Sequence, residues 1–305
     1  MNYRHAYHAG NFADVLKHAV LTLVLEYMKR KQAPFRVIDT HAGAGRYALA
    51  SPQAEKTGEW QGGIARLMGV DAKPLPPPVA QHLQPYLDVV RRVNVGDTLG
   101  FYPGSPAIAL SLMRPQDTLI ANELHPEELS LLEDAIGGDR RAKLMALDAW
   151  VALKALLPPK ERRGVVLIDP PFEEKDEFDR IATGLMQGLQ RFATGIYIVW
   201  YPIKDLKPVA RFHAALAALA IPKSLRVELM LERPRDPDRL NGCGLIVVNP
   251  PYTLDGQLGA VLPELSRRLA STRGGGGYRL DWLDPTHASP GKAAPEAKRR
   301  MRIRP

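Results

Sequence analysis

Seven short apolar runs recur along the chain, and segments with helical spacing of apolar residues separate most of them. The runs are nearly continuous rather than alternating, which is typical of strands covered on both faces and therefore mainly parallel. This alternation predicts an α/β fold built on a doubly wound, mainly parallel sheet. The predicted strands are Phe35–Asp39, Thr118–Ala121, Lys143–Leu147, Val165–Ile168, Ile196–Trp200, Leu225–Leu231 and Leu245–Val248.

Apolar residues at spacings of three and four predict the helices between these strands. The last two predicted strands differ, because only Glu232–Gly242 separates them, too few residues for a helical crossover. We therefore expect these two strands to form an antiparallel hairpin at one edge of the sheet. The predicted helices cover residues 13–31, 79–93, 126–136, 178–192 and 209–220.

Residues 51–100 differ in composition from the rest of the chain. They contain Pro74-Leu75-Pro76-Pro77-Pro78, scattered glycines and only the one predicted helix. We interpret them as a small helical insertion on the surface of the main domain. The 305 residues then suit a single domain over residues 1–285 that begins with an arm and helix at 1–31.

The net charge of +8 is concentrated at the two ends of the chain. Residues 1–36 carry six basic and two acidic side chains, residues 286–305 carry six and one, and residues 37–285 carry 29 and 30. Residues 286–305 also lack hydrophobic periodicity, which predicts a disordered basic tail. A basic chain of this kind favours a polyanionic partner such as nucleic acid.

Several classes of protein are excluded by what the chain contains. Cys243 is the single cysteine, so an internal disulfide and a cysteine-based zinc site are impossible. His5, His8 and His18 are not accompanied by a carboxylate cluster, and we predict no metal site. The N-terminal residues do not resemble a signal peptide, and apolar runs fall short of the roughly 18–20 residues of a membrane span. We expect a soluble, cytoplasmic protein with no membrane partner.

In a doubly wound sheet, ligands bind beyond the carboxyl ends of the strands, near the switch in strand order. Gly43 and Gly45 follow the first predicted strand, where they suit either close approach to a ligand or a plain strand-to-helix turn. Glu123 follows the second strand, where an acid can hold ribose hydroxyls or remain solvated near a helix N-terminus. Asp148 and Ala149 follow the third.

The fourth predicted strand ends in Asp169-Pro170-Pro171-Phe172, which resembles the catalytic loop of methyltransferases that act on adenine N6 and related exocyclic amines. The Asp169 side chain and the Pro170 carbonyl can accept the two N–H groups of an adenine amino group, so that its lone pair points outward. The prolines stiffen the loop, and Phe172 offers a face on which the base can stack. A sulfonium methyl donor requires no metal.

A second copy of the signature, Asn249-Pro250-Pro251-Tyr252, follows the last predicted strand. The two strings cannot be separated by composition, but their positions differ. The strand before Asp169 should lie beside the first strand, whereas the strand before Asn249 should lie at the edge. We therefore assign catalysis to Asp169 and interpret Asn249 as part of a structural turn.

Longer motifs identify the chain as similar to the J family of bacterial large-subunit ribosomal RNA methyltransferases, which methylate 23S rRNA at N6 of adenine 2030. The resemblance runs from residue 2 to about residue 283. It is carried by Tyr3-Arg4-His5, His8-Ala9-Gly10-Asn11, Ala13–His18, Asp39–Tyr47, Tyr102–Pro106, Glu123–Pro126, Ile168–Pro171, Arg191–Tyr197 and Asn249-Pro250-Pro251.

The resemblance implies a Rossmann-like fold and S-adenosylmethionine (SAM) as the cofactor. It implies that Glu123 holds the SAM ribose, that Asp148 contacts its adenine, and that Tyr3 contacts the RNA. This chain departs from the family at Phe172, where tyrosine is usual, at Ala149, where glycine is common, and at Asn122, where threonine is common. The implied SAM contacts are His18, His41, Ser105, Glu123, Asp148, Ala149 and Asp169, and the glycine loop after the first predicted strand adds Gly43.

Other assignments remain open from the sequence. Arg4 and Lys17 suit contacts with RNA phosphates or simple solvated charges, and His5 and His8 suit either RNA contact or local structure. A DNA adenine or protein-amide methyltransferase shares the signature, and an RNA-binding protein on a non-catalytic methyltransferase fold is a third possibility. We expect a monomer that acts on 23S rRNA, either naked or in an assembly intermediate.

Overall fold

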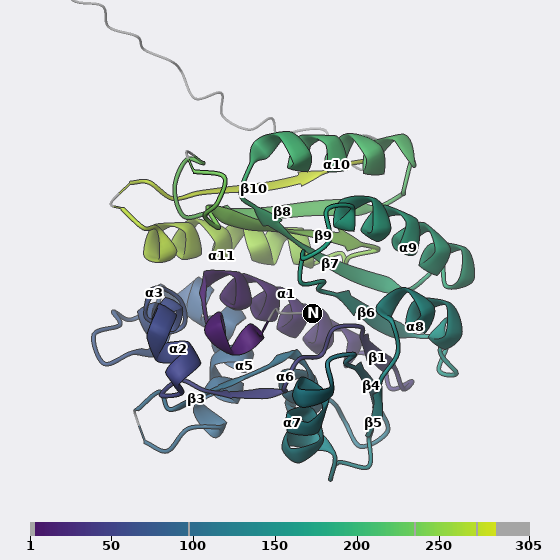
Figure 1. Cartoon of the computed structure of the whole chain (residues 1–305), viewed down its shortest axis with the longest axis horizontal. Helices are drawn as coiled ribbons and strands as arrows, with labels where there is room; N and C mark the ends of the chain where they lie inside the picture. The colour runs from purple at the N-terminus through teal and green to yellow at the C-terminus, as the bar shows by residue number, and fades with distance from the viewer. Residues whose placement is uncertain (1–3, 97, 235, 273, 285–305) are drawn as a thin grey trace, which may run out of the picture.

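The computed structural model describes residues 4–96, 98–234, 236–272 and 274–284. Within them, an eight-stranded sheet has the order β10-β8-β9-β7-β6-β1-β4-β5, with helices on both faces (Figure 1). Tyr3 and the predicted tail lie outside the described residues. No helix in the described ranges is both long and apolar enough to cross a membrane.

The parallel half of the sheet contains the switch in strand order. β1 (Arg36–Asp39) pairs in parallel with β4 (Thr118–Asn122) on one side and with β6 (Gly164–Ile168) on the other. β5 (Ala142–Met145) lies outside β4, and β7 (Ile196–Ile203) lies outside β6. The chain returns from β5 to β6, so the order reverses between β1 and β6. The prediction that the strand before Asp169 lies beside the first strand is confirmed.

The antiparallel end of the sheet is larger than predicted. β8 (Ser224–Met230) and β9 (Gly242–Val248) form the predicted hairpin. The hairpin is not at the edge, however, because β10 (Gly277–Trp282) pairs antiparallel with β8 and is the outermost strand. β9 also pairs antiparallel with β7. The chain therefore leaves β9 at the end of the sheet where the parallel strands begin, opposite their carboxyl ends.

The two faces of the sheet bury alternate residues of each strand, as the two-residue period requires. In β6, Val165 and Leu167 belong to one hydrophobic core, and Val166 and Ile168 belong to the other. Figure 1 shows α8, α9 and α10 together on one side of the sheet and α1 and α11 on the other. The helices are α1 Phe12–Met28, α6 Ser105–Leu112, α7 Pro126–Ile136, α8 Ala149–Leu156, α9 Glu177–Arg191, α10 Leu206–Ala218 and α11 Leu254–Leu269.

Helix α1 is buried along almost its whole length, which is unusual for a helix close to the start of a chain. A short 3-10 helix, η1 (His5–Tyr7), precedes it. The side chain of Asn11 caps the N-terminus of α1 by accepting hydrogen bonds from the Ala13 and Asp14 amides. The predicted amphipathic helix is therefore a central helix of the core.

The segment interpreted as an insertion is flanked by β2 (Arg46–Ala48) and β3 (Phe101–Pro103), which pair with each other in a separate two-stranded sheet. Where one helix was predicted, four lie between these strands. The last of them, α5, buries Leu83 and Tyr86 in the same core as α1. The four are α2 Pro52–Thr57, α3 Glu59–Gly62, α4 Ala65–Met68 and α5 Pro77–Arg92.

Candidate active site

A cavity of about 890 Å³ lies where the carboxyl ends of β1, β4 and β6 meet. It brings together residues predicted from separate parts of the sequence, whereas Arg4 and Gly45, which are also described, do not line it. The sequence-predicted residues that line it are Lys17, His18, His41, Gly43, Ser105, Glu123, Asp148, Ala149, Asp169, Pro170 and Phe172.

The glycine loop after β1 is tied to the acid after β4. Gly43 and Gly45 have φ of +60° and +74°, a left-handed conformation that favours glycine. The amide of Gly43 donates to Oε2 of Glu123 at 2.8 Å, and the amide of His125 donates to Oε1 at 2.8 Å. Two backbone amides therefore fix the orientation of the Glu123 carboxylate at the cavity wall.

Asn122, which sequence reasoning treated only as a departure from the family, connects three loops. Its side-chain amide donates to the carbonyls of Thr40 and Leu147, and its side-chain oxygen accepts from the Leu147 amide, all at 2.9–3.0 Å. Thr40, Asn122 and Leu147 follow or end β1, β4 and β5. The Asn122 side chain therefore holds the three strand ends at fixed spacing.

Asp39 at the end of β1 is buried and accepts a 2.6 Å hydrogen bond from the Ser105 hydroxyl. Burial raises the pKa of Asp39 to about 7, and the nearby Asp169 charge adds to this increase. A carboxylate in this position would be stabilised by a cationic ligand group. The sequence singled out Ser105 but not the acid that it contacts.

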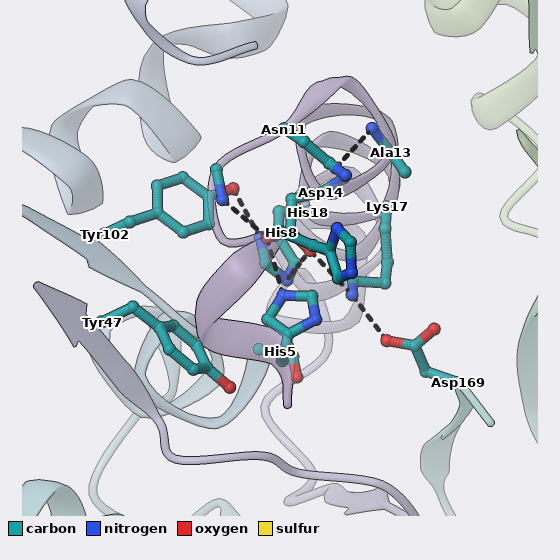
Figure 2. A network of polar contacts seen from close by, with 12 residues as sticks. His5, His8, Asn11, Ala13, Asp14, Lys17, His18, Tyr47, Tyr102 and Asp169 are labelled. Atoms are coloured by element: carbon teal, nitrogen blue, oxygen red, sulfur yellow. Dashed lines mark hydrogen bonds and ion pairs between the residues drawn. The ribbon is translucent and has the colours of Figure 1, made fainter. Parts of the chain in front are cut away.

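Lys17 lies between two carboxylates (Figure 2). Its Nζ is 2.9 Å from Asp14 and 2.5 Å from Oδ2 of Asp169, and its side chain is only 5% exposed. Burial acts to lower the pKa of Lys17, but the charges of Asp14 and Asp169 outweigh it and raise the pKa. This placement does not favour the predicted phosphate contact, because the ammonium is already paired inside the protein.

Asp14 is the centre of this charged group and was not singled out from the sequence. It accepts hydrogen bonds from His5 Nε2 at 2.9 Å and from the Gly10 amide at 2.8 Å, in addition to its ion pair with Lys17. Burial acts to raise the pKa of Asp14, but the charges of His5 and Lys17 hold it well below its usual value. Its spacing of three from Lys17 and four from His18 was the available signal.

His18 is buried, and burial lowers its pKa to about 3, so the ring is neutral at pH 7. Its Nδ1 is 2.7 Å from the Tyr102 hydroxyl, which is 2.8 Å from the Tyr86 hydroxyl. Its Nε2 is buried and makes no hydrogen bond within the described residues. Two tyrosines thus orient a ring that retains one unpaired nitrogen in the wall of the cavity.

The loop after β6 places an aromatic ring beside Asp169. Phe172 has φ of +54°, in the left-handed region, and its ring lies 5.0 Å from Phe178 and 5.8 Å from Trp200, centroid to centroid. Both contacts are edge-on and hold the Phe172 ring in the cavity wall. The backbone of Phe172 is strained as residues at functional sites often are.

Asp148 caps helix α8 by accepting from the amides of Trp150 and Val151. Trp150 lies edge-on to His41 at 6.3 Å, and the Arg180 guanidinium lies 5.6 Å from the Trp150 ring centroid. Burial lowers the pKa of His41 to about 4, so this ring too is neutral at pH 7. Trp150 and Arg180, which sequence reasoning did not select, thus add an aromatic face and a cation to this end of the cavity.

The N-terminal arm contacts several elements around the cavity. His8 Nδ1 is 3.0 Å from Glu59 of α3, and the Asn11 side chain also donates to Glu59 at 2.9 Å. Arg4 forms a 2.6 Å ion pair with Glu127 at the start of α7 and is 42% exposed. His5 and His8 therefore have internal partners, which favours a role in local structure for both.

Asn249, in the second copy of the signature, has a different role from Asp169. Its side-chain amide donates to the carbonyls of Ala193 and Gly195 at 2.8 Å, and its own amide donates to Lys223. Ala193 and Gly195 precede β7, at the end of the sheet where the parallel strands begin, away from the cavity. These contacts favour the interpretation of Asn249-Pro250-Pro251-Tyr252 as a structural turn.

Within the described ranges, no group of three or more His, Cys, Asp or Glu side chains is arranged to hold a metal ion. The cavity instead combines oriented carboxylates, glycine backbone and aromatic rings. This combination suits an organic ligand with a ribose and a cationic group, placed next to a second aromatic ligand.

Comparisons with known proteins agree with this arrangement. A family model described as "Ribosomal RNA large subunit methyltransferase D, RlmJ" matches residues 32–284. The chain is 44% identical over 285 residues to ribosomal RNA large subunit methyltransferase J of Escherichia coli (strain K12), covering 93% of this chain and 99% of that protein. It is 41% identical over 286 residues to the protein of the same name from Haemophilus influenzae, with the same two coverages.

A solved structure is also similar over most of the chain. Protein LPL1258 from Legionella pneumophila is 35% identical, covers 90% of this chain and 98% of its own, and superposes with a TM-score of 0.82. The overall fold of this chain is therefore one already observed by experiment.

Proposed function

The chain belongs to the ribosomal RNA large subunit methyltransferase J family, and from this premise we propose that it transfers a methyl group from SAM to N6 of adenine 2030 in 23S rRNA. The observation that carries the proposal is the meeting of Glu123 and Asp169-Pro170-Pro171-Phe172 in one cavity. One wall suits a nucleoside cofactor, and the adjacent loop suits an adenine amino group.

The residues of the cavity fit SAM. Glu123 is oriented by two amides, so its carboxylate can accept hydrogen bonds from ribose hydroxyls. Asp39 is a buried carboxylate whose pKa is raised to about 7, so a cationic ammonium group beside it would stabilise its ionised form. His41, Asp148 and Trp150 lie at the far end, where an adenine ring can stack and hydrogen-bond.

SAM, when bound, supplies a methyl group on a positively charged sulfur, so the protein needs no covalent nucleophile. The remaining task is to orient the target nitrogen. We assign this task to Asp169 and the Pro170 carbonyl, which accept the two N–H groups and direct the lone pair into the cavity. Phe172 provides the face on which the base stacks.

Lys17 has a positioning role in this scheme. It engages Oδ2 of Asp169, which leaves Oδ1 for an N–H of the substrate. Proton loss from N6 follows methyl transfer, and a strong general base is not required.

The partner is 23S rRNA, and we propose that the protein acts as a monomer without a metal, in the cytoplasm where that RNA is found. A target adenine within a helix has to be flipped out or presented by partly unfolded RNA to reach Asp169. Either naked RNA or an assembly intermediate can present it in this way.

The test is transfer of labelled methyl groups from SAM to unmodified large-subunit rRNA, followed by mapping of the modified nucleotide. Wild-type protein should label N6 of one adenine, and Asp169→Ala should not. DNA and protein substrates are included as competitors, because a DNA adenine or protein-amide methyltransferase would prefer them. SAM binding by calorimetry in the absence of RNA distinguishes an enzyme from a non-catalytic RNA-binding protein. Absence of transfer by the wild type would refute the proposal.

A further inference from the structure

Tyr252 is one of the most exposed large hydrophobic side chains in the described part of the protein, at 77%. It ends the second copy of the signature, which the active site does not use. It follows β9 at the end of the sheet opposite the cavity, where the loop that carries it lies beside the loop that precedes β7. A tyrosine ring in that position makes no contribution to the core and is free to contact a partner.

The loop that carries Tyr252 is held rigidly. Asn249 adopts φ of +52° and is fixed by the three hydrogen bonds described above. Pro250 and Pro251 restrict the backbone, and the amide of Leu254 donates to the Pro251 carbonyl at the start of α11. Tyr252 is therefore presented at a fixed place, which lowers the entropic cost of using it as a contact.

The neighbours of Tyr252 are aromatic and basic. The Tyr27 ring, near the end of α1, lies 5.7 Å from the Tyr252 ring at an interplanar angle of 81°. The Arg30 guanidinium lies 5.3 Å from the Tyr27 ring centroid. Lys31, next to Arg30 in the chain, is exposed, as is Lys223, whose backbone carbonyl accepts a hydrogen bond from the Asn249 amide. We call Tyr27, Arg30, Lys31, Lys223 and Tyr252 the distal patch.

The backbone beneath the basic part of the patch is also fixed. Arg114 donates to the carbonyls of Lys31 and Ala33, and Arg163 donates to the carbonyls of Met28 and Ala33. Arg163 adds positive charge under the loop, whereas the charge of Arg114 is balanced by its ion pair with Asp117. The acidic groups near the patch are Asp255, Glu26, which pairs with Lys29, and Asp284, whose carboxylate accepts from the Lys223 amide. They are outnumbered by the cations Lys29, Arg30, Lys31, Arg163 and Lys223. The patch therefore has a net positive character.

We propose that the distal patch binds an unpaired base and the adjoining phosphates of the RNA substrate, at a site separate from the one that holds the target adenine. Exposed aromatic rings among cations are typical of surfaces that bind single-stranded nucleic acid, because every base has a face that can stack. The proposal rests on the proposed function for the identity of the RNA. It predicts an effect on affinity for long RNA and none on the methyl-transfer step.

The test compares Tyr252→Ala, Tyr252→Trp and Arg30→Gln on two RNAs: unmodified 23S rRNA, and a short hairpin cut from it around the target adenine. Tyr252→Ala should raise the Kd and KM for the long RNA at least about fivefold, because a base–aromatic stack is lost. Tyr252→Trp should restore the affinity. Arg30→Gln should reduce the slope of log affinity against log salt by about 0.7, the value for one phosphate contact of a single strand.

Tyr278→Ala is the matched control, because Tyr278 is an exposed tyrosine (48%) on the edge strand β10. It should bind both RNAs like the wild type, and thermal unfolding should show that every variant is folded. Wild-type affinity of Tyr252→Ala for the long RNA would overturn the proposal, as would an equal loss on the short hairpin. Failure of the proposed function would give a different result, because wild-type protein would then methylate neither RNA. The Kd values of the variants for the two RNAs could still be compared.

Discussion

Lys17 and Asp169 are 152 positions apart in the chain, yet the Lys17 ammonium lies 2.5 Å from the Asp169 carboxylate. The same ammonium is 2.9 Å from Asp14. One buried cation thus joins the N-terminal helix to the loop that we assign to the target base. Damage to this contact should affect both catalysis and the fold.

Lys17→Met should lower kcat more than it changes the affinity for SAM, because Asp169 loses the partner that orients it. The free energy of unfolding should fall by about 3 kcal/mol, because two largely buried carboxylates lose their cation. Single-turnover methyl transfer and urea denaturation measure the two effects.

The double variant Asp14→Asn/Lys17→Met separates these effects. Removing one of the two uncompensated carboxylates should recover much of the lost stability, while methyl transfer should stay low. If activity recovered together with stability, Lys17 would be a structural residue only.

Alanine substitution in the two copies of the signature should have different effects, on methyl transfer in the first copy and on stability in the second. Asp169→Ala should reduce methyl transfer at least about 100-fold, because an acceptor that orients the nucleophile is lost. Asn249→Ala should leave transfer and SAM affinity close to wild type. It should cost about 2 kcal/mol of stability, because it removes two hydrogen bonds and places alanine in the left-handed region. Methyl-transfer assays paired with chemical denaturation decide between the two sites, and a catalytic defect in Asn249→Ala would contradict the assignment.

Asp39 should make the stability of the SAM-free protein depend on pH. Its pKa is about 7 in the folded protein against an ordinary value of 3.8 for an aspartate, so between these values the folded state holds a proton that the unfolded chain has released. This stabilising contribution is present in full below about pH 3.8 and is lost as the pH rises through about 7, by up to about 1.4 kcal/mol per pH unit.

Asp39→Asn removes the ionisable group and keeps an oxygen that can accept from Ser105. The free energy of unfolding of the wild type, minus that of this variant, should therefore decrease as the pH rises from about 5 to about 8. Comparing the two proteins cancels the titration of His18 and His41, whose pKa values are lowered by burial and whose effect has the opposite sign. A constant difference across this range would rule out the raised pKa.

Removal of residues 286–305 should weaken general affinity for RNA and reduce its salt dependence, because six basic side chains are lost. The choice of adenine should be unchanged, since the residues around Asp169 remain. Arg4→Ala is the contrasting variant and should reduce turnover instead. Filter binding at several salt concentrations, with mapping of the methylated nucleotide, tests this division. It would be wrong if deletion of the tail abolished methylation while Arg4→Ala remained active.

Periodicity in the sequence was sufficient to predict the parallel half of the sheet. The runs before Asp39, Asn122 and Asp169 are buried on both faces, so they consist almost entirely of apolar residues. β10 was missed because an edge strand needs no such run, and Gly277–Trp282 mixes charged, aromatic and small residues. For the same reason the hairpin was placed at the edge, which β10 in fact occupies.

The candidate site was predictable where a single loop carries it. Gly43, Glu123 and Asp169 each follow a recognisable strand, and all three line the cavity. The Asp14–Lys17–Asp169 group and the His18–Tyr102–Tyr86 chain depend on contacts between distant segments. Burial of a lysine is also contrary to what its residue type suggests, because only the paired carboxylates make it favourable.

Asn122 has a consequence for how quickly the enzyme can take up its cofactor. A single side chain ties the ends of β1 and β4 to the loop after β5, so these loops cannot move independently of one another. Binding then requires little ordering of the backbone, and association should proceed in one kinetic step limited by entry rather than by a slow rearrangement. Under the proposed function, these tied loops give the methyl donor a pocket whose shape is set before it binds.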